Sequence, residues 1–226
     1  SEVGSYFSII KAIAAGNHKL SSIASVLEVK STNLTKYLKT LMDLDILERR
    51  VPVTEGNPEK SKRGLYKIKD NYLRFWFAFI YPNMSFIESG HSGIVMDKIR
   101  KGLTTSHIGF VYEDICQERM WELNVNNAWP FQFSKLGGYW DAKNEIDIAA
   151  LDPEGKNLIL GECKYWKEPV GLNVLHALET KACDVAWERD RRKVWYVLFS
   201  ISGFSDELRN HAATRDDLLL IDDGER

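Results

Sequence analysis

Apolar residues recur every three or four positions through the first 45 residues of the chain, which is the spacing of amphipathic helices. Three such stripes predict helices over residues 6–15, 21–27 and 31–42, and Ser31 is the predicted N-cap of the third. Residues 46–51 and 65–68 are then predicted to be strands on either side of a polar loop, residues 54–64. The N-terminal part should therefore fold as three helices followed by a hairpin.

Three helices and a hairpin form the plan of a winged helix-turn-helix domain, which we assign to residues 1–70. Basic side chains lie on the third helix and on the hairpin, where they can contact the phosphates and the major groove of DNA. These predicted DNA-binding residues are Lys36, Lys39, Arg49, Arg50, Lys62 and Arg63. The alternative is a protein-interaction domain whose charges are only solvated, and the sequence leaves both open.

An unusually aromatic segment, residues 70–81, follows the hairpin and ends before Pro82. Rings that stack on bases are usually interleaved with basic residues, and only Arg74 interrupts this run, so an apolar core between domains is the favoured interpretation. Residues 83–101 are predicted to form one or two helices and residues 102–106 a hinge. Residues 71–106 are therefore predicted to form an aromatic helical connector.

The remaining residues, 107–226, alternate between helical and strand-like patterns. The predicted order is a helix over 107–121, short strands around 128–133, a hairpin over 145–165, a helix over 172–187 and a strand over 194–199. A last helix, 205–213, leads into the apolar residues 218–221. This αβββαβ order predicts a mixed α/β (α+β) domain with the hairpin in the middle of its sheet.

Charged residues interrupt that hairpin at two places, Asp147 on one strand and Glu162 with Lys164 on the other. Alternation puts Glu162 and Lys164 on one face, and the turn formed by residues 152–155 brings Asp147 beside them. The flanking apolar residues indicate a sheet covered on both faces, where unpaired charges are costly. The three residues resemble the core of the PD-(D/E)XK nucleases, although an amphipathic hairpin with a solvated charged face would give the same pattern.

A wider resemblance covers nearly the whole chain. The aromatic run Tyr66 to Tyr81, the segment Gly109 to Glu113, and the two hairpin segments around Asp147 and Glu162 resemble the DUF234 family, the C-terminal region of archaeal-type ATPases. The family resemblance implies a P-loop ATPase module, a winged helix and a PD-(D/E)XK-like domain in that order. The sequence contains no Gly-x4-Gly-Lys-Ser/Thr motif, so we expect it to be the C-terminal part of such a protein or a natural truncation of one, with the ATPase module in the same parent chain or in trans as a partner.

The resemblance also implies roles for the hairpin residues. Asp147, Glu162 and the backbone carbonyl of Cys163 would ligate Mg²⁺ or Mn²⁺, and Lys164 would act on the attacking water and the phosphorane. Glu113 would add a contact from the preceding helix, with Glu118 as a competing candidate. The implied function is a metal-dependent DNA endonuclease, and the alternative is an inactive module that binds DNA or a partner and regulates the ATPase.

Global composition adds little to these expectations. Thirty Lys and Arg against 32 Asp and Glu give a net charge of −2, which neither indicates nor excludes nucleic acid. Cys116, Cys163 and Cys183 lack metal-ligand spacing and fit reduced thiols, so we expect a cytoplasmic protein. The longest apolar block, residues 75–81, is far shorter than the ~20 residues of a membrane span, and no membrane partner is expected.

Overall fold

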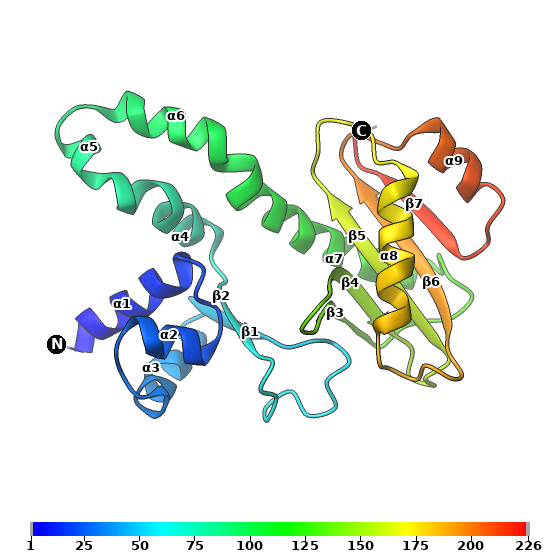
Figure 1. Cartoon of the computed structure of the whole chain (residues 1–226), viewed down its shortest axis with the longest axis horizontal. Coiled ribbons are helices and arrows are strands. Elements are labelled where there is room, and N and C mark those ends of the chain that lie inside the picture. The colour runs from blue at the N-terminus through cyan, green and yellow to red at the C-terminus, as the bar shows by residue number, and fades with distance from the viewer. Residues whose placement is uncertain (1, 225–226) are drawn as a thin grey trace. The chain divides into compact units, whose positions relative to one another are not determined.

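The computed structural model describes residues 2–224, without the side chains of residues 2–4, 105 and 106. The described chain divides into two compact units (Figure 1). The first unit runs to Val51 and continues through Asn57–His107. The second comprises Pro52–Gly56 and the chain from Ile108 onward. Each unit is described in turn.

The first unit begins with the three helices that the apolar stripes predict. They are α1 (Glu2–Ala14), α2 (Leu20–Val26) and α3 (Ser31–Asp43). Two short antiparallel strands follow, β1 (Leu47–Arg50) and β2 (Leu65–Ile68). Leu34, Leu38 and Leu41 of α3 are buried as predicted. The predicted cap is wrong, because Lys30 is the residue with extended backbone before α3 and Ser31 already lies inside the helix.

The aromatic segment after β2 is helical. Its elements are α4 (Asn71–Phe75), a π-helical turn (Trp76–Ile80), a 3₁₀ turn (Tyr81–Asn83), α5 (Met84–Glu88) and α6 (Ser92–Leu103). Phe77 is buried in the apolar core of this unit, and its ring lies 5.4 Å from that of Phe7 on α1. The aromatic run therefore supplies core to the first unit.

The predicted hinge over residues 102–106 is helical, and the division between the two units falls just after it, between His107 and Ile108. Helix α6 continues to Leu103, and a π-helical turn, Thr104–Ile108, comes directly after it. A glycine ends a helix most readily with positive φ, and the glycines with positive φ are Gly16, Gly90, Gly155 and Gly203 among the described residues, not Gly102. Gly102 alone therefore does not interrupt the helix.

The second unit is a five-stranded sheet with helices on its faces. Its elements are α7 (Gly109–Val125), β3 (Lys135–Trp140), β4 (Glu145–Leu151), β5 (Asn157–Lys164), α8 (Leu172–Asp184), β6 (Lys193–Ser200), α9 (Asp206–Ala212) and β7 (Leu218–Asp222). The strand order is β3-β4-β5-β6-β7. Strands β3, β4 and β5 pair antiparallel, whereas β5, β6 and β7 pair parallel. The mixed α and β composition and the interior position of the hairpin are as predicted.

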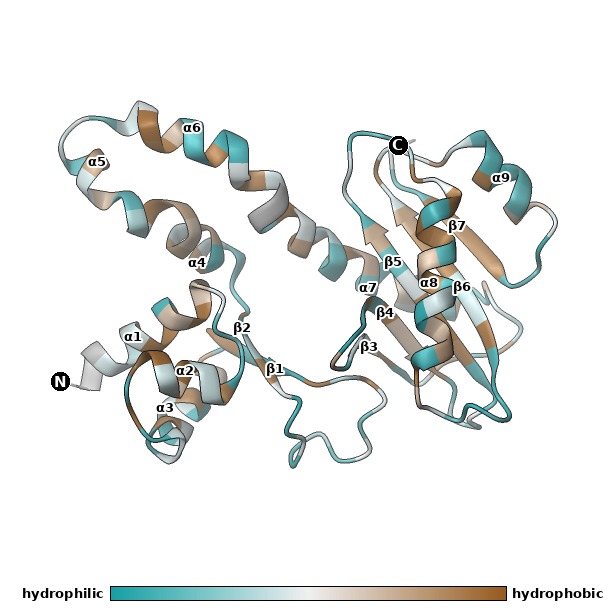
Figure 2. Cartoon of the chain, viewed as in Figure 1, coloured by the Kyte–Doolittle hydropathy of each residue, from teal (hydrophilic) through white to brown (hydrophobic). Residues whose placement is uncertain are grey.

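Two apolar layers hold the helices to the sheet. Helix α8 contributes Leu175 and Leu178 to the layer that also contains Leu158 and Leu160 of β5. Helix α7 contributes to the opposite layer, whose buried members include Cys116, Met120, Ile148, Ile159 and Cys163. Figure 2 shows apolar and polar residues interleaved along α8, as expected for a helix with one face on a sheet. Within residues 2–224, no helix has both the length and the apolar character needed to cross a membrane.

The strands predicted around residues 128–133 are absent, and this segment is irregular. Its apolar side chains are nevertheless buried, since Trp129 and Phe133 lie in the layer beneath α7. The side chain of Asn124 bonds to the backbone N–H and C=O of Phe133, at 3.0 and 3.1 Å, in place of a neighbouring strand. The first strand of the sheet therefore starts later, at Lys135.

Candidate active site

Strands β4 and β5 form the predicted hairpin. They pair from Leu151 opposite Leu158 to Ile148 opposite Gly161. In the turn, Asp152 Oδ1 accepts a hydrogen bond from the Lys156 N–H at 3.0 Å, and Gly155 takes the positive φ of 72° that favours glycine. Local turn chemistry thus fixes the register of the two strands.

Beyond the Ile148–Gly161 pair, the Asp147 side chain accepts a hydrogen bond that a backbone carbonyl of β4 would otherwise accept. The Cys163 N–H donates to Asp147 Oδ2 at 2.9 Å, whereas the backbone pairing of β4 with β5 ends at Ile148, the residue after Asp147. The pairing of β3 with β4 is also irregular nearby, with a register shift between Gly137 and Tyr139. The carboxylate of Asp147 is therefore inserted where β4 and β5 separate, next to Glu162 and Lys164.

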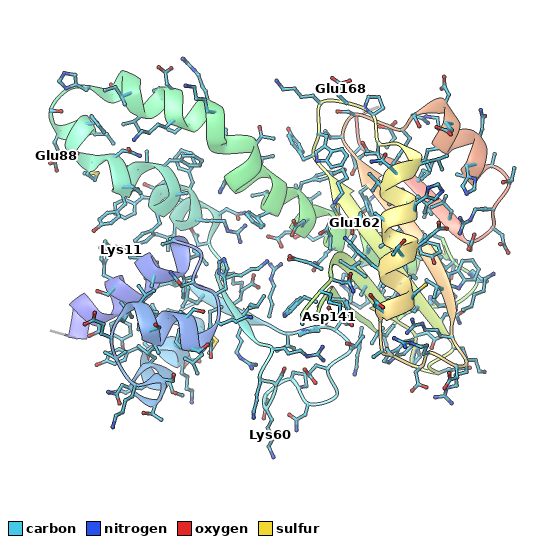
Figure 3. All side chains as sticks on the ribbon, in the orientation of Figure 1. Lys11, Lys60, Glu88, Asp141, Glu162 and Glu168 are labelled. Atoms are coloured by element: carbon cyan, nitrogen blue, oxygen red, sulfur yellow. The ribbon has the colours of Figure 1, made fainter. Side chains whose placement is uncertain are left out.

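The two acids and the lysine meet at this point, as the alternation of side chains predicts. Lys164 Nζ lies 2.5 Å from Glu162 Oε2 and 3.3 Å from Asp147 Oδ2. The exposed fractions of the side chains are only 6% for Glu162, 16% for Asp147 and 19% for Lys164. Figure 3 shows Glu162 on the sheet beside α8. Three charged groups are thus held together with little access to water.

A second lysine, Lys181 of α8, completes the cluster, and the sequence interpretation missed it. Its Nζ lies 2.7 Å from Glu162 Oε1 and donates to the Glu145 carbonyl at 2.8 Å. Both carboxylate oxygens of Glu162 therefore carry a lysine. The available signal was the helical spacing, because Lys181 follows the buried residues Val174 and Leu178 by seven and three positions and so falls on the face turned to the sheet.

Burial and charge act in opposite directions on the two acids. Burial and the neighbouring Glu162 charge raise the pKa of Asp147 above its ordinary value, against the opposing effects of Lys164 and the Cys163 N–H. Burial also opposes ionisation of Glu162, but Lys164 and Lys181 together outweigh it and lower the pKa of this carboxyl. Burial opposes the charge of Lys164, yet its two acidic partners raise its pKa. Lys164 is therefore held protonated.

Helix α7 reaches the site from the other face of the sheet. Gln117 donates to the Asp147 carbonyl at 3.4 Å, a contact that the sequence interpretation did not anticipate. Glu113, one turn earlier, is half-buried and lies close enough to Cys163 for its charge to add to the burial that raises the pKa of that thiol. The competing candidate, Glu118, is exposed. The structure thus favours Glu113 over Glu118 as the acid nearest the hairpin.

The chemistry of the donors fits one hard divalent cation. Carboxylates from Asp147 and Glu162 already share a single positive atom, Lys164 Nζ, so one cation can touch both. Oxygen donors of this kind suit Mg²⁺ or Mn²⁺. Because the N–H of Cys163 points to the Asp147 side of β5, its carbonyl points the same way. Among the described residues no three His, Cys, Asp or Glu side chains are grouped closely enough to hold a metal without such help.

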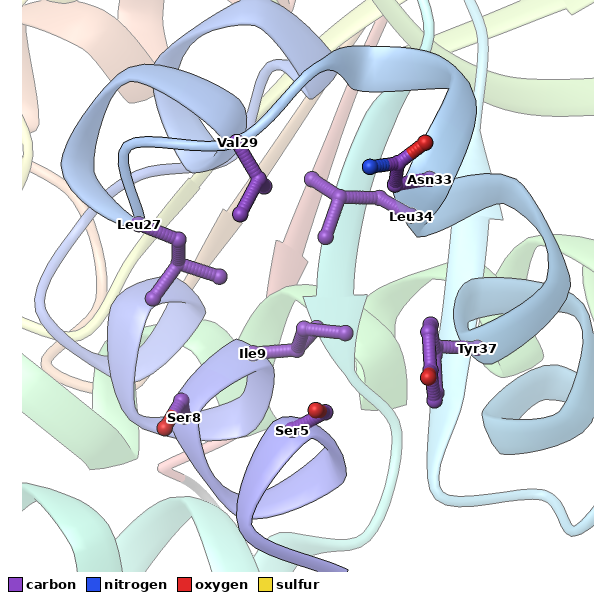
Figure 4. A pocket seen from close by; sticks show the side chains of 8 residues that line it. All are labelled: Ser5, Ser8, Ile9, Leu27, Val29, Asn33, Leu34 and Tyr37. Atoms are coloured by element: carbon purple, nitrogen blue, oxygen red, sulfur yellow. The ribbon is translucent and has the colours of Figure 1, made fainter. Parts of the chain in front are cut away.

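A cavity in the first unit is a weaker candidate for chemistry. It has a volume of about 510 Å³ and is lined by α1, α3 and the turn before α3 (Figure 4). Its lining is Ser5, Ser8, Ile9, Leu27, Val29, Asn33, Leu34 and Tyr37, none of which is charged at neutral pH. This cavity therefore offers no ion pair or metal ligand comparable with the hairpin cluster.

The basic residues predicted to bind DNA fall into two groups. Arg49 donates to the backbone carbonyls of Pro58 and Ser61, at 2.8 and 2.6 Å, so its guanidinium organises the loop between β1 and β2. Arg50 is paired with Glu48 at 2.5 Å. The other four side chains, Lys36, Lys39, Lys62 and Arg63, are exposed. These four side chains are thus more exposed than Arg49 and Arg50, which are half-buried.

Comparisons with known proteins give a family match and one relative. Residues 76–182 match the model of the DUF234 family, described as "Archaea bacterial proteins of unknown function". Over 167 residues the chain is 41% identical to an uncharacterized protein of Methanocaldococcus jannaschii, a stretch that covers 74% of this chain and 37% of that protein. The chain thus spans little more than a third of this relative. No solved structure matches. The family match includes Glu113, Gln117, Asp147, Glu162, Lys164 and Lys181.

Proposed function

We propose that the second unit is a metal-dependent phosphodiesterase of the PD-(D/E)XK type that cleaves DNA. The observation that carries this proposal is that the ammonium group of Lys164 contacts two carboxylates, Asp147 and Glu162. Both carboxylates have little exposure and lie on neighbouring interior strands of the sheet. A protein that needed only stability would gain little from burying these charges, because a buried ion pair is often no better than an apolar pair of the same size. A role in binding a metal ion and stabilising the charged phosphate during hydrolysis explains why these charged side chains are buried.

The residues divide the work of hydrolysis. Bound Mg²⁺ or Mn²⁺ would activate a water molecule and offset the charge of the scissile phosphate. Asp147 and Glu162 would hold the cation, and the Cys163 carbonyl would be a further ligand. Lys164, which is held protonated, donates hydrogen bonds to the phosphate oxygens as negative charge develops there. Gln117 fixes the backbone of Asp147, and Lys181 fixes the carboxylate of Glu162.

The first unit supplies the DNA-binding part of the proposal. We assign to it the role of a winged helix-turn-helix that holds duplex DNA through Lys36, Lys39, Lys62 and Arg63. An ATPase module, in the same parent chain or in trans, is the proposed partner, and this assignment depends on the family resemblance alone. The alternative, a regulatory module that binds DNA or a partner without cleaving, is a possible outcome of the following test.

Two substitutions at the hairpin separate metal binding from chemistry. Loss of a residue that only hydrogen-bonds a metal ligand weakens metal binding by roughly 10- to 100-fold. Asp147→Asn, which alters a ligand itself, should weaken Mn²⁺ binding by at least as much and should reduce cleavage as well. Lys164→Met should leave Mn²⁺ binding intact and reduce cleavage by about 100-fold or more. Calorimetric titration with Mn²⁺ and a plasmid-nicking assay measure the two effects. If the unaltered protein binds no divalent ion at millimolar concentration, with or without DNA, the regulatory alternative replaces the nuclease.

A further inference from the structure

Trp166, two residues after Lys164, is exposed beside the candidate site. Its side chain is 48% exposed, whereas most large apolar residues of the second unit are buried. Lys164 Nζ lies over one face of its ring, 5.8 Å from the ring centre. The preceding ring behaves differently, because Tyr165 packs against Tyr112 of α7 with ring centres 5.6 Å apart. Trp166 therefore presents a partly exposed ring beside the site without filling the core.

The backbone that carries Trp166 is fixed on both sides. The Ile201 N–H donates to the Lys164 carbonyl at 3.3 Å, and the Ser202 hydroxyl donates to the Trp166 carbonyl. Four residues later, the Val170 N–H donates to the Gly203 carbonyl at 2.9 Å. The loop is thus tied to the segment after β6, and the ring is held near Lys164 despite its exposure.

Charge at the site does not select one form of nucleic acid. Asp147 and Glu162 balance Lys164 and Lys181, so a divalent cation would leave a net positive site that attracts any phosphate. An exposed ring does select, because base faces inside a duplex are covered by their neighbours. Stacking on an aromatic side chain needs a base that has left the helix.

We propose that Trp166 stacks on an unpaired base of the strand whose phosphate contacts Lys164. The inference rests on the proposed nuclease function and names its substrate class, a nucleic acid that is single-stranded at the cleavage point. Because Lys164 Nζ lies over one face of the Trp166 ring, the base stacks on the opposite face while a phosphate of the same strand contacts Lys164.

Binding measurements test the stacking directly. The probe is a fluorescently labelled single-stranded oligonucleotide with Ca²⁺ replacing Mg²⁺, compared with the same strand made abasic. Trp166→Leu should weaken binding of the normal strand by roughly 5- to 150-fold, the usual effect of losing one stacked base, and leave the abasic strand unchanged. Trp166→Phe, which keeps a ring, should retain most of the affinity. Trp121→Leu is the matched control, since Trp121 is 44% exposed on α7.

The outcomes separate this inference from the nuclease proposal. If Trp166→Leu binds both strands as the unaltered protein does, or weakens both equally, Trp166 is not a stacking residue even when cleavage is observed. If Trp166→Leu affects only the normal strand but the unaltered protein cleaves no nucleic acid with Mg²⁺ or Mn²⁺, stacking stands and the nuclease proposal fails. Cleavage of duplex and single-stranded DNA at equal rates, both unaffected by Trp166→Leu, would overturn the substrate class.

Discussion

Lys181 of α8 lies 2.7 Å from Oε1 of Glu162 on β5, which joins a helix and a strand by an ion pair over one face of the sheet. The Glu162 side chain is 6% exposed and that of Lys181 is 29% exposed. A metal ion that used Oε1 would have to displace this lysine or share the oxygen with it. Lys181 therefore both positions Glu162 and competes with a cation for it.

Lys181→Met should change stability and metal affinity in opposite directions. Loss of its hydrogen bonds to Glu162 and Glu145 should lower the free energy of unfolding without metal by about 1 kcal/mol, since the lysine is partly solvated. Removal of a positive charge beside the cation should strengthen Mn²⁺ binding by about 1 kcal/mol, roughly fivefold. Urea denaturation and calorimetry measure these changes. Lys135→Met is the control, because Lys135 is an exposed lysine at the start of β3. Weaker Mn²⁺ binding in Lys181→Met alone would contradict the competition between Lys181 and the metal for Glu162.

Asp147→Asn should stabilise the metal-free protein at neutral pH. The pKa of Asp147 is raised on folding, so its contribution to stability is present below the ordinary value of 3.8 and is lost as the pH rises through the folded-state pKa. At pH 7 the ionised group therefore destabilises the fold, and its removal should add about 0.5 to 2 kcal/mol, as often happens when a functional charge is removed. The gain should disappear near pH 3.

Glu162→Gln should show the opposite behaviour. The pKa of Glu162 is lowered, so its contribution is present above the ordinary value of 4.5 and is lost as the pH falls through the folded-state pKa. The variant should be less stable at pH 7 by about 1 to 3 kcal/mol and should approach the unaltered protein in acid. Denaturation curves in EDTA between pH 3 and 8 compare both variants. Equal effects of the two substitutions at pH 7 would contradict the opposite pKa shifts.

The sequence was sufficient to predict the hairpin and its three charged residues because both depend on local rules. Alternation along β4 and β5 and the turn residues Asp152 and Gly155 together determine which side chains meet. Lys181 and Gln117 could not be placed in the same way, because their contacts depend on how α8 and α7 pack on the sheet. Tertiary packing likewise explains the mistaken strand at residues 128–133, whose backbone bonds to Asn124.

Substitutions in the β1–β2 hairpin, at Arg49 on β1 and at Lys62 in the loop, should separate structural from DNA-binding basic residues. Arg49→Ala should lower the free energy of unfolding by about 1 to 3 kcal/mol, because the carbonyls of Pro58 and Ser61 lose their donor. Lys62→Ala should leave stability within about 0.5 kcal/mol and reduce the slope of log affinity for duplex DNA against log salt by about one. Thermal unfolding and salt titration measure both. An unchanged slope in Lys62→Ala with Arg63→Ala would exclude this loop as the DNA surface.

Gly161→Ala should distort β5 next to the candidate site. A Cβ atom at Gly161 would lie 2.6 Å from Val197 Cγ1, 2.8 Å from the Val197 carbonyl oxygen and 3.2 Å from Ile148 Cβ. Because one of these atoms is backbone of β6, the clash cannot be relieved by a side-chain rotation alone, and β5 must shift. We expect a loss of roughly 1 to 3 kcal/mol of stability, as in other overpacked cores.

The same shift should move Glu162, the next residue on β5, and so weaken Mn²⁺ binding at a temperature where the variant is still folded. Val197→Ala removes Cγ1 but keeps the carbonyl, so Gly161→Ala with Val197→Ala should recover only part of the stability lost by Gly161→Ala. Chemical denaturation and Mn²⁺ calorimetry on the single and double variants form a complete cycle. Full recovery of both properties in the double variant would show that the side chain of Val197, and not the approach of the β6 backbone, is what requires glycine at position 161.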